Sequence, residues 1–425
     1  MLRKKVESFM NLKKSITWAV AGLFVFVSVL SAEEIKGDKT AGKTDARRLA
    51  KSGMDDSGPT STFFNINSWK IQMEHQGFFQ WNGTSHGSAG NYPKGMGSVI
   101  FAEGILWGVK ASDKYGVDGT TGEILTDGSG SGLPRVRVNG SMYNTGLKAG
   151  KVLRDANGRI KSKDYSENYR DQQIWRVRKD WNTGDLTVDA SILRDIGVAD
   201  VTEAMIAADK AQYEHDWNHW PVAEGAPYDD VDGDGVYTPG TWSAENNAWV
   251  GDIPGIPGSD QTVWTVANDL PDEYAEGGVV SVSEGGWGSP PVGFEMQLTL
   301  WGYDFPFSNP ISSMMFKRAR MIYVGLPGGP ADAKLDTVYF TQWSDPDLGT
   351  YTDDYVGCDT TLSLGYVYNG NTFDDQFLSS FGSPVPAGGY DFLEGPKVDT
   401  NGDGVLDTLG TVSYTHLTLP TMQVV

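Results

Sequence analysis

The segment FEMQLTLWGY, residues 294–303, is the clearest strand in the sequence, because polar and apolar side chains alternate along it. A period of two places successive side chains on opposite faces of a sheet. One face then carries only polar side chains and the other only apolar ones (Glu295, Gln297 and Thr299; Phe294, Met296, Leu298 and Leu300). The segment therefore predicts a strand that turns one face toward a hydrophobic core.

Further runs of this kind are separated by turn residues. They are QTVWTVAN (261–268), SMMFKRARMIYVG (313–325), LDTVYFTQW (335–343) and TLSLGYVYNG (361–370), and shorter runs between 62 and 155 predict a β meander. Short strands at this spacing are typical of antiparallel sandwiches. We predict a mainly β fold of antiparallel, sandwich-like sheets, joined by long loops rich in Gly, Pro and Asp.

One helix is predicted, near residues 200–217. Asp200 and Glu203 have the spacing of a capping box, which would satisfy the first free backbone N–H groups of a helix. Val201, Met205 and Ala208 then recur at helical spacing, which predicts that they form its apolar face.

The two ends of the chain differ from the rest. The run ITWAVAGLFVFVSVL (16–30) follows Lys13 and Lys14 and precedes Ser31 and Ala32, the pattern of a cleaved secretory signal. It is shorter than the roughly 20 residues that span a bilayer, and no later segment is apolar enough to do so. The uncharged end VSYTHLTLPTMQVV (412–425) resembles translated sequencing-adapter read-through, so we expect the natural protein to continue differently beyond about Gly410.

These features predict eight consecutive regions. They are a signal peptide (1–32), a flexible leader (33–62), an N-terminal β-rich region (63–199), the helix (200–220), a calcium-loop segment (221–260), a C-terminal sandwich-like domain (261–396), a second calcium loop (397–410) and an artefactual tail (411–425). The single cysteine, Cys358, cannot form an intramolecular disulfide. We expect it to be a small buried side chain.

Negative charge is concentrated in the second half of the chain. The net charge is −21; residues 1–210 hold 29 basic and 24 acidic side chains, whereas residues 211–425 hold 5 and 31. Such a surface repels phosphate backbones and anionic lipids, so we expect no nucleic-acid partner. It attracts cations, although the charge could also serve solubility alone.

The strongest local motif is YDDVDGDGVYTPG, residues 228–240. Asp230, Asp232 and Asp234 stand at positions 1, 3 and 5 of a D-x-D-x-D-G loop, and Val236 would offer its carbonyl at position 7. Calcium takes six to eight hard oxygen ligands, so the motif predicts a Ca²⁺ site without the flanking helices of an EF-hand. Three nearby acids could complete it (Asp229, Glu245 or Asp252). The alternative is a solvated turn.

Two further acidic stretches are candidates. DTNGDGVLD places Asp399, Asn401, Asp403 and Asp407 at the spacing of calcium loops, and it resembles those of dockerin and thrombospondin type 3 repeats. The stretch WSDPDLGTYTDDYVGCD contains closely spaced carboxylates with no basic side chain between them (Asp345, Asp347, Asp353, Asp354 and Asp359). A bound cation would relieve their repulsion. The alternatives are a solvated loop or a glycosidase pair of carboxylates.

Two catalytic motifs are matched only in part. GTSHG (83–87) has the letters of a nucleophile elbow around Ser85, but the residues after it do not favour the required helix. HDWNH (215–219) spaces two histidines as zinc proteases do, but no third ligand is apparent. We expect a capping or surface role for these histidines.

Several phrases resemble an uncharacterised family of exported proteins from marine Bacteroidetes-like bacteria, whose members often end in a type IX secretion sorting domain. They include GAPYDDVDGDGVYTPG (225–240) and TQWSDPDLGTYTDDYVGCDTTLSLGYVYNG (341–370). The resemblance implies a surface or secreted location and no particular activity. We therefore expect a calcium-stabilised structural or adhesive scaffold rather than an enzyme, with an extracellular glycan or surface protein as a possible partner. The alternative is a polysaccharide-binding or glycan-hydrolysing protein that uses exposed tryptophans (Trp242, Trp249 or Trp287).

Overall fold

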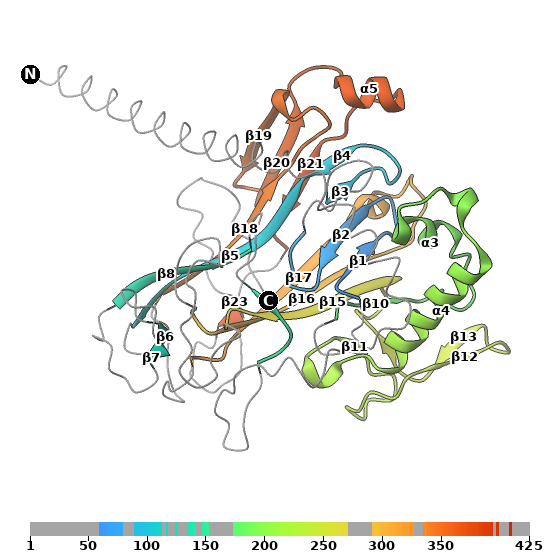
Figure 1. Cartoon of the computed structure of the whole chain (residues 1–425), viewed down its shortest axis with the longest axis horizontal. Coiled ribbons are helices and arrows are strands. Elements are labelled where there is room, and N and C mark those ends of the chain that lie inside the picture. Colours follow the sequence, from blue (N-terminus) through green and yellow to red (C-terminus); the bar gives the residue numbers. More distant parts are fainter. Residues whose placement is uncertain are drawn as a thin grey trace, which may run out of the picture.

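The strand FEMQLTLWG lies in the middle of a five-stranded sheet, hereafter the larger sheet, which faces two smaller sheets across the core (Figure 1). The computed structural model describes residues 59–79, 89–112, 116–117, 124–125, 134–141, 147–152, 173–270, 291–326, 335, 337–393, 397–398 and 408–409. Within them the protein is mainly β, and its paired strands are antiparallel. The predicted fold class is confirmed.

The larger sheet has the order β10-β15-β16-β17, and β9 also pairs with β15. Its strands are β9 (Lys148–Ala149), β10 (Trp175–Arg178), β15 (Gln261–Asn268), β16 (Phe294–Gly302) and β17 (Phe316–Tyr323). The register pairs Phe294 with Tyr323 and Val263 with Leu300. Strands from the two predicted β regions therefore share one sheet.

The facing strands form two groups. One is the sheet β18-β5-β8, made of β18 (Thr337–Asp345), β5 (Ala102–Ser112) and β8 (Pro134–Gly140). The other is a meander of β1 (Ser61–Phe64), β2 (Lys70–Glu74), β3 (Gly90–Asn91) and β4 (Ser98–Ile100). The meander predicted for residues 62–155 is therefore observed only in its first part, because β5, β8 and β9 belong to other sheets.

The hydrophobic core fills the space between these sheets. Trp107 of β5 and Phe340 of β18 both pack edge-on against Phe294, at ring-centroid distances of 5.7 and 5.6 Å. The predicted apolar face of β16 is confirmed, since Met296, Leu298 and Leu300 also belong to this core. Its polar face is buried too: the Gln297 side-chain amide donates to the backbone oxygen of Glu224, at 2.7 Å.

Three α-helices lie in the described residues: α3 (Thr187–Arg194), α4 (Glu203–Asn218) and α5 (Asp375–Phe381). The prediction anticipated α4 but neither of the shorter helices. Thr202, not Asp200, caps α4: its hydroxyl accepts the backbone N–H of Met205. The predicted buried face was wrong, because Ala208 is exposed and the helix buries Asp209, Tyr213, Asp216 and Trp217 instead.

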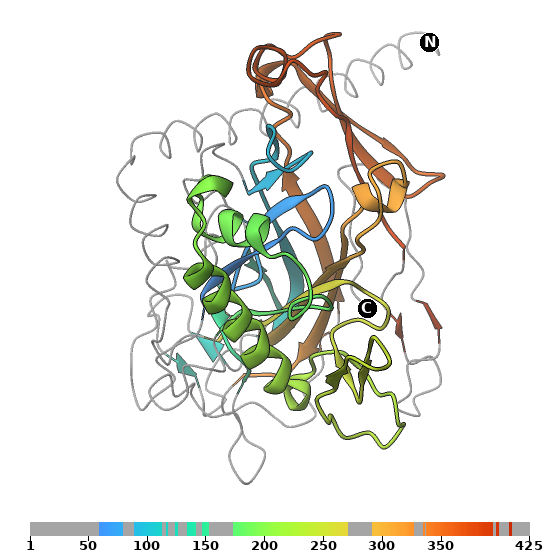
Figure 2. The same cartoon turned by 90° about the vertical axis from the view of Figure 1, so that its right-hand side faces the viewer.

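Helix α4 and the chain after it cover the second face of the larger sheet (Figure 2). Trp264 and Val266 of β15 point to this side, where they join a second apolar cluster with Trp175, Trp217 and Trp220. The larger sheet is therefore buried on both faces, with the main core on one side and a tryptophan-rich layer on the other.

Short turns and small sheets complete the described structure. The turns are η2 (Val198–Asp200), η3 (Val222–Glu224), η4 (Pro310–Ser313) and η5 (Tyr351–Asp353). The small sheets are β6 (Gly116–Val117) with β7 (Ile124–Leu125), β11 (Tyr228–Asp229) with β14 (Ile253–Pro254), β12 (Thr241–Ser243) with β13 (Ala248–Val250), and β22 (Lys397–Val398) with β23 (Thr408–Leu409). A last sheet joins β19 (Asp354–Asp359), β20 (Leu364–Asn369) and β21 (Gly388–Asp391).

Two further predictions concern the surface and the membrane. Cys358 lies exposed on β19, so the prediction of a buried side chain was wrong. None of the helices in the described part of the chain has the length and apolar character needed to cross a membrane. The predicted signal peptide and the predicted tail lie outside the described residues.

Candidate metal centre

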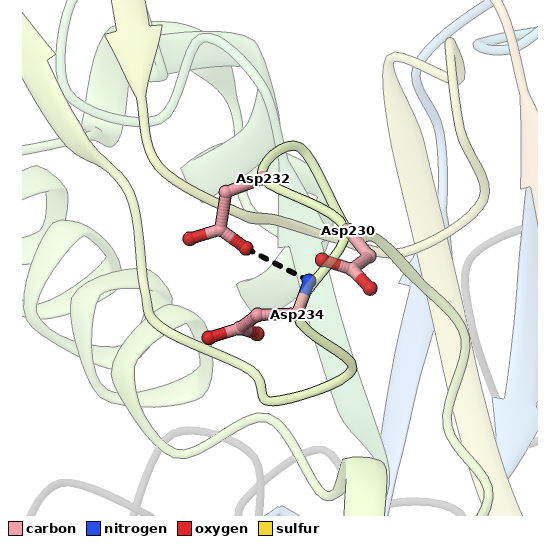
Figure 3. A group of neighbouring side chains, drawn as sticks. All are labelled: Asp230, Asp232 and Asp234. Atoms are coloured by element: carbon pink, nitrogen blue, oxygen red, sulfur yellow. Dashed lines mark hydrogen bonds between the residues drawn. The ribbon is translucent and has the colours of Figure 1, made fainter.

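The aspartate loop predicted from the sequence begins at the end of β11. Asp232 and Asp234 are exposed, Asp230 is half-buried, and one carboxylate oxygen from each lies within 4.8 Å of the other two (Figure 3). Among the described residues, these three aspartates are the one set of three or more carboxylate, imidazole or thiol side chains that lie this close together. The structure thus brings together the three aspartates of the motif.

Local hydrogen bonds and two glycines give the loop its shape. The Asp230 carboxylate accepts the backbone N–H groups of Gly233 and Gly235, at 2.8 and 2.9 Å. Asp232 accepts the N–H of Asp234 (3.2 Å), a bond drawn in Figure 3. Gly233 and Gly235 have φ values of 75° and 74°, a region that glycine adopts without steric cost. The D-x-D-x-D-G pattern therefore folds the loop by itself.

Asp252 closes the loop from a distance in sequence. Its side chain is 1% exposed, and its two carboxylate oxygens accept the backbone N–H groups of Val231 (2.9 Å) and Thr238 (2.7 Å). Because Asp252 is buried and does not belong to the group formed by the other three carboxylates, we assign it to positioning. Of the other two suggested ligands, Asp229 lies in β11 and Glu245 is exposed in the turn between β12 and β13.

The electrostatics of the loop favour a cation. The N–H of Asp234 lowers the pKa of Asp232, but burial and the charges of Asp234, Asp252 and Asp230 raise it more, so the net shift is upward. Burial, followed by the charges of Asp230, Asp252, Asp234 and Asp232, raises the pKa of Tyr228. Three carboxylates with oxygens within 4.8 Å of one another repel each other, and a cation bound between them would relieve that repulsion.

The aromatic layer attaches this segment to the fold. Trp217 of α4 stacks on Trp249 of β13 with ring centroids 4.1 Å apart, and its indole N–H donates to Gly240 O at 2.9 Å. Tyr237, just after the aspartates, donates its hydroxyl to Trp217 O at 2.5 Å. The indole N–H and the backbone carbonyl of Trp217 therefore both form hydrogen bonds with the segment that follows the loop.

The tryptophans suggested as sugar platforms are part of this layer. Trp242 and Trp249 are half-buried and pack edge-to-face across the β12–β13 pair, at 5.5 Å. The indole N–H of Trp249 donates to Lys179 O. Trp287 lies outside the described residues. Packing between the rings and this hydrogen bond explain the positions of Trp242 and Trp249.

The remaining predicted ligands are placed differently. Val236 is exposed, and its N–H donates to Asp234. Asp345 ends β18, whereas Asp353 and Asp354 lie at the boundary between η5 and β19. These residues and Asp347 do not form a three-carboxylate group within the described part of the chain. The residues of the second loop (Asp399, Asn401, Asp403 and Asp407) lie outside the described residues.

The pKa of Asp354, in the same acidic stretch, is raised. Burial raises its pKa to about 6, helped by the charges of Asp353 and Asp374 and opposed by the hydrogen bond from Leu348 N. Because the folded-state value lies above the unfolded one, ionised Asp354 destabilises the fold above pH 6. That penalty disappears as the pH falls through 6 toward 4.

We therefore expect Asp354→Asn to stabilise the protein at pH 7.5 by about 1 kcal/mol, a figure already discounted for partial exposure, and to have little effect at pH 4. Urea unfolding at both pH values measures this. Asp375→Asn is the control, because Asp375 is exposed on the adjacent helix α5. Equal effects of Asp354→Asn at the two pH values would contradict the assignment.

The two partly matched catalytic motifs resolve differently. GTSHG lies outside the described residues. In HDWNH, His219 ends α4 as its C-terminal cap residue and stacks on His215, while Asp216 is buried and accepts the backbone N–H of Arg176 at 3.1 Å. The predicted capping role is confirmed.

Comparison with known proteins adds no further constraint on this site. No family model, curated protein or solved structure matches the chain.

Proposed function

We propose that this chain is an exported β scaffold, structural or adhesive, that Ca²⁺ stabilises through the aspartate loop. The observation that carries the proposal is the convergence of Asp230, Asp232 and Asp234 in a loop that Asp252 closes. The sequence pattern of an export signal and the resemblance to exported surface proteins support the location. A bound Ca²⁺ would neutralise the three carboxylates, with the Val236 carbonyl as a further candidate ligand.

The protein's own residues determine what this neutralisation would do. The loop is connected through Tyr237 to Trp217, and thus to α4 and the tryptophan layer on the larger sheet. An ion that binds only the folded state adds stability by mass action, about 2.7 kcal/mol at a hundredfold excess over Kd. The loop would therefore stabilise the tryptophan layer that packs on β10 and β15 of the larger sheet.

We expect the melting temperature of the full chain to rise by a few degrees on adding Ca²⁺ to chelator-treated protein. Mg²⁺ should have a much smaller effect. Asp232→Asn should abolish most of the calcium response, because asparagine can still accept the Asp234 N–H but contributes no charge. Glu214→Gln removes one charge from an exposed position of α4 and should respond as the wild type does. Thermal melts followed by tryptophan fluorescence measure all of these.

Two results would contradict the proposal. Identical melting temperatures in chelator and in Ca²⁺ would show that calcium does not stabilise the protein. A calcium response that survives Asp232→Asn but disappears in Asp403→Asn would move the site to residues 399–407 and reject the aspartate loop.

A further inference from the structure

The sheet β19–β20–β21 exposes a row of three tyrosine rings. Tyr355, Tyr366 and Tyr368 are 58%, 39% and 46% exposed. Neighbouring rings lie nearly parallel: the Tyr355–Tyr368 centroids are 6.0 Å apart with planes at 26°, and the Tyr366–Tyr368 centroids are 6.1 Å apart at 33°. The strand register places all three on one face, because Tyr355 pairs with Tyr368 and Gly357 pairs with Tyr366.

Glycines let these rings lie against the sheet. A Cβ added to Gly357 would meet the Tyr366 ring at 2.5 Å, and one added to Gly370 would meet the Tyr355 ring at 2.2 Å. Aromatic rings that cover glycines in this way stabilise a sheet. Such covering accounts for the inner faces of the rings. The rest of each ring remains exposed.

The sheet is fixed to the core on its other side. Val367, between the two tyrosines of β20, is 4% exposed and belongs to the main core. Tyr390 of β21 points the same way, and its hydroxyl donates to the buried Glu103 at 2.7 Å. The tyrosine face therefore rests on a rigid support at one end of the molecule (Figure 1).

Carboxylates flank the rings, and the segment that carries them contains no basic side chain. The register pairs Asp359 with Leu364, and Leu364 with Asp391, so both carboxylates belong to the tyrosine face, one pair along from Tyr366. Residues 351–393 contain six aspartates and no Lys, Arg or His. Anionic ligands are repelled here, whereas a cation can bind both the carboxylates and the negative faces of the rings.

We propose that the tyrosine face binds an amine-bearing polysaccharide, a polymer of glucosamine type. Exposed aromatic rings suit the C–H faces of sugar rings, and the flanking Asp359 and Asp391 suit their protonated amino groups. A basic peptide shares the charge but lacks the flat repeating faces. This site is independent of the aspartate loop and of the calcium proposal.

The test is calorimetric titration of the full chain with a fully deacetylated glucosamine hexamer, at a pH where its amines are protonated. We expect binding that Tyr366→Ala and Tyr355→Ala each weaken on the order of tenfold, and that Asp391→Asn weakens roughly threefold with a smaller salt dependence. Tyr366→Phe keeps the ring and should bind nearly as well as the wild type. Tyr339→Ala removes a more exposed tyrosine, on β18, and should change nothing.

Every other outcome overturns the proposal. Because the whole chain is acidic, a polycation could bind without using the tyrosine face. Equal affinity of Tyr366→Ala, Tyr355→Ala and the wild type would show such non-specific binding. Equal affinity for the N-acetylated hexamer would reject recognition of the amine. Equal, tyrosine-dependent affinity for hexalysine would make the face a basic-peptide site instead. A thermal melt of each variant identifies any loss of affinity that comes from unfolding. In that case the affinity of Tyr366→Phe decides whether the ring is required.

Discussion

Replacing Asp189 by alanine is expected to lower the free energy of unfolding by about 3–5 kcal/mol, because it leaves buried positive charge without a partner. Asp189 of α3 is 3% exposed and forms an ion pair with Arg176 of β10, which is itself 5% exposed. Arg178 approaches the same carboxylate at 3.5 Å. Burial alone would raise the pKa of Asp189, but these arginines and the bond from Asn65 lower it overall.

The carboxylate also joins separate parts of the fold. Asn65, just after β1, donates to it at 2.7 Å, and Tyr213 of α4 donates its hydroxyl at 3.0 Å. The Arg176 guanidinium lies over the Tyr213 ring, 4.9 Å from its centroid. Removing Asp189 therefore loosens β1, β10 and α4 together, which is why the expected loss exceeds that of an ordinary hydrogen bond.

A double-mutant cycle tests this explanation by urea unfolding. Adding Arg176→Met to Asp189→Ala should recover part of the loss, because it removes the uncompensated charge. Asp185→Ala is the matched control: this exposed aspartate accepts the N–H of Thr187 near the start of α3, and its replacement should cost much less than that of Asp189. Strictly additive losses from Asp189→Ala and Arg176→Met would show that the two charges are not coupled in the fold.

The sequence predicted the sheets well because alternation is a local property. The apolar face of β16 and the existence of α4 both follow from side-chain spacing within one element. The same reasoning failed where a polar side chain finds its partner far along the chain. Alternation alone would bury Val136 of β8 and expose Arg137, but Arg137 is 2% exposed and donates to Pro291 O, whereas Val136 is 78% exposed. The prediction for α4 failed in the same way, because Asp209 is buried against Arg194.

The aspartate loop was predictable for a similar reason. Its three carboxylates, two glycines and internal hydrogen bonds all lie within six residues. Residues 345–354 contain the same side-chain type at a similar density, but strand ends and a turn separate them. The clamping role of Asp252 and the tyrosine face were missed. The glycines and tyrosines of GYVYNG (365–370) were a signal for the face, but its rings become neighbours only through strand pairing.

Trp217→Ala is the second substitution with a large expected effect, a loss of about 3–5 kcal/mol in the free energy of unfolding. Trp217 is 2% exposed, and its indole lies between α4 and the chain that follows the aspartate loop. Truncation leaves a cavity beside Trp249 and Trp181, whose rings contact it at centroid distances of 4.1 and 6.4 Å. It also leaves Gly240 O without the indole N–H that it accepts.

Two further substitutions separate packing from hydrogen bonding in this layer, again by urea unfolding. Trp217→Phe keeps an aromatic ring but loses the bond to Gly240 O. Its loss in the free energy of unfolding should be about 1–2 kcal/mol smaller than that of Trp217→Ala. Trp242→Ala removes a half-buried indole at the margin of the same layer, where it packs only edge-on against Trp249. Its cost should stay below about 2 kcal/mol. If Trp242→Ala destabilised the protein as much as Trp217→Ala, the layer would depend on total aromatic area and not on the anchoring of α4 at Trp217.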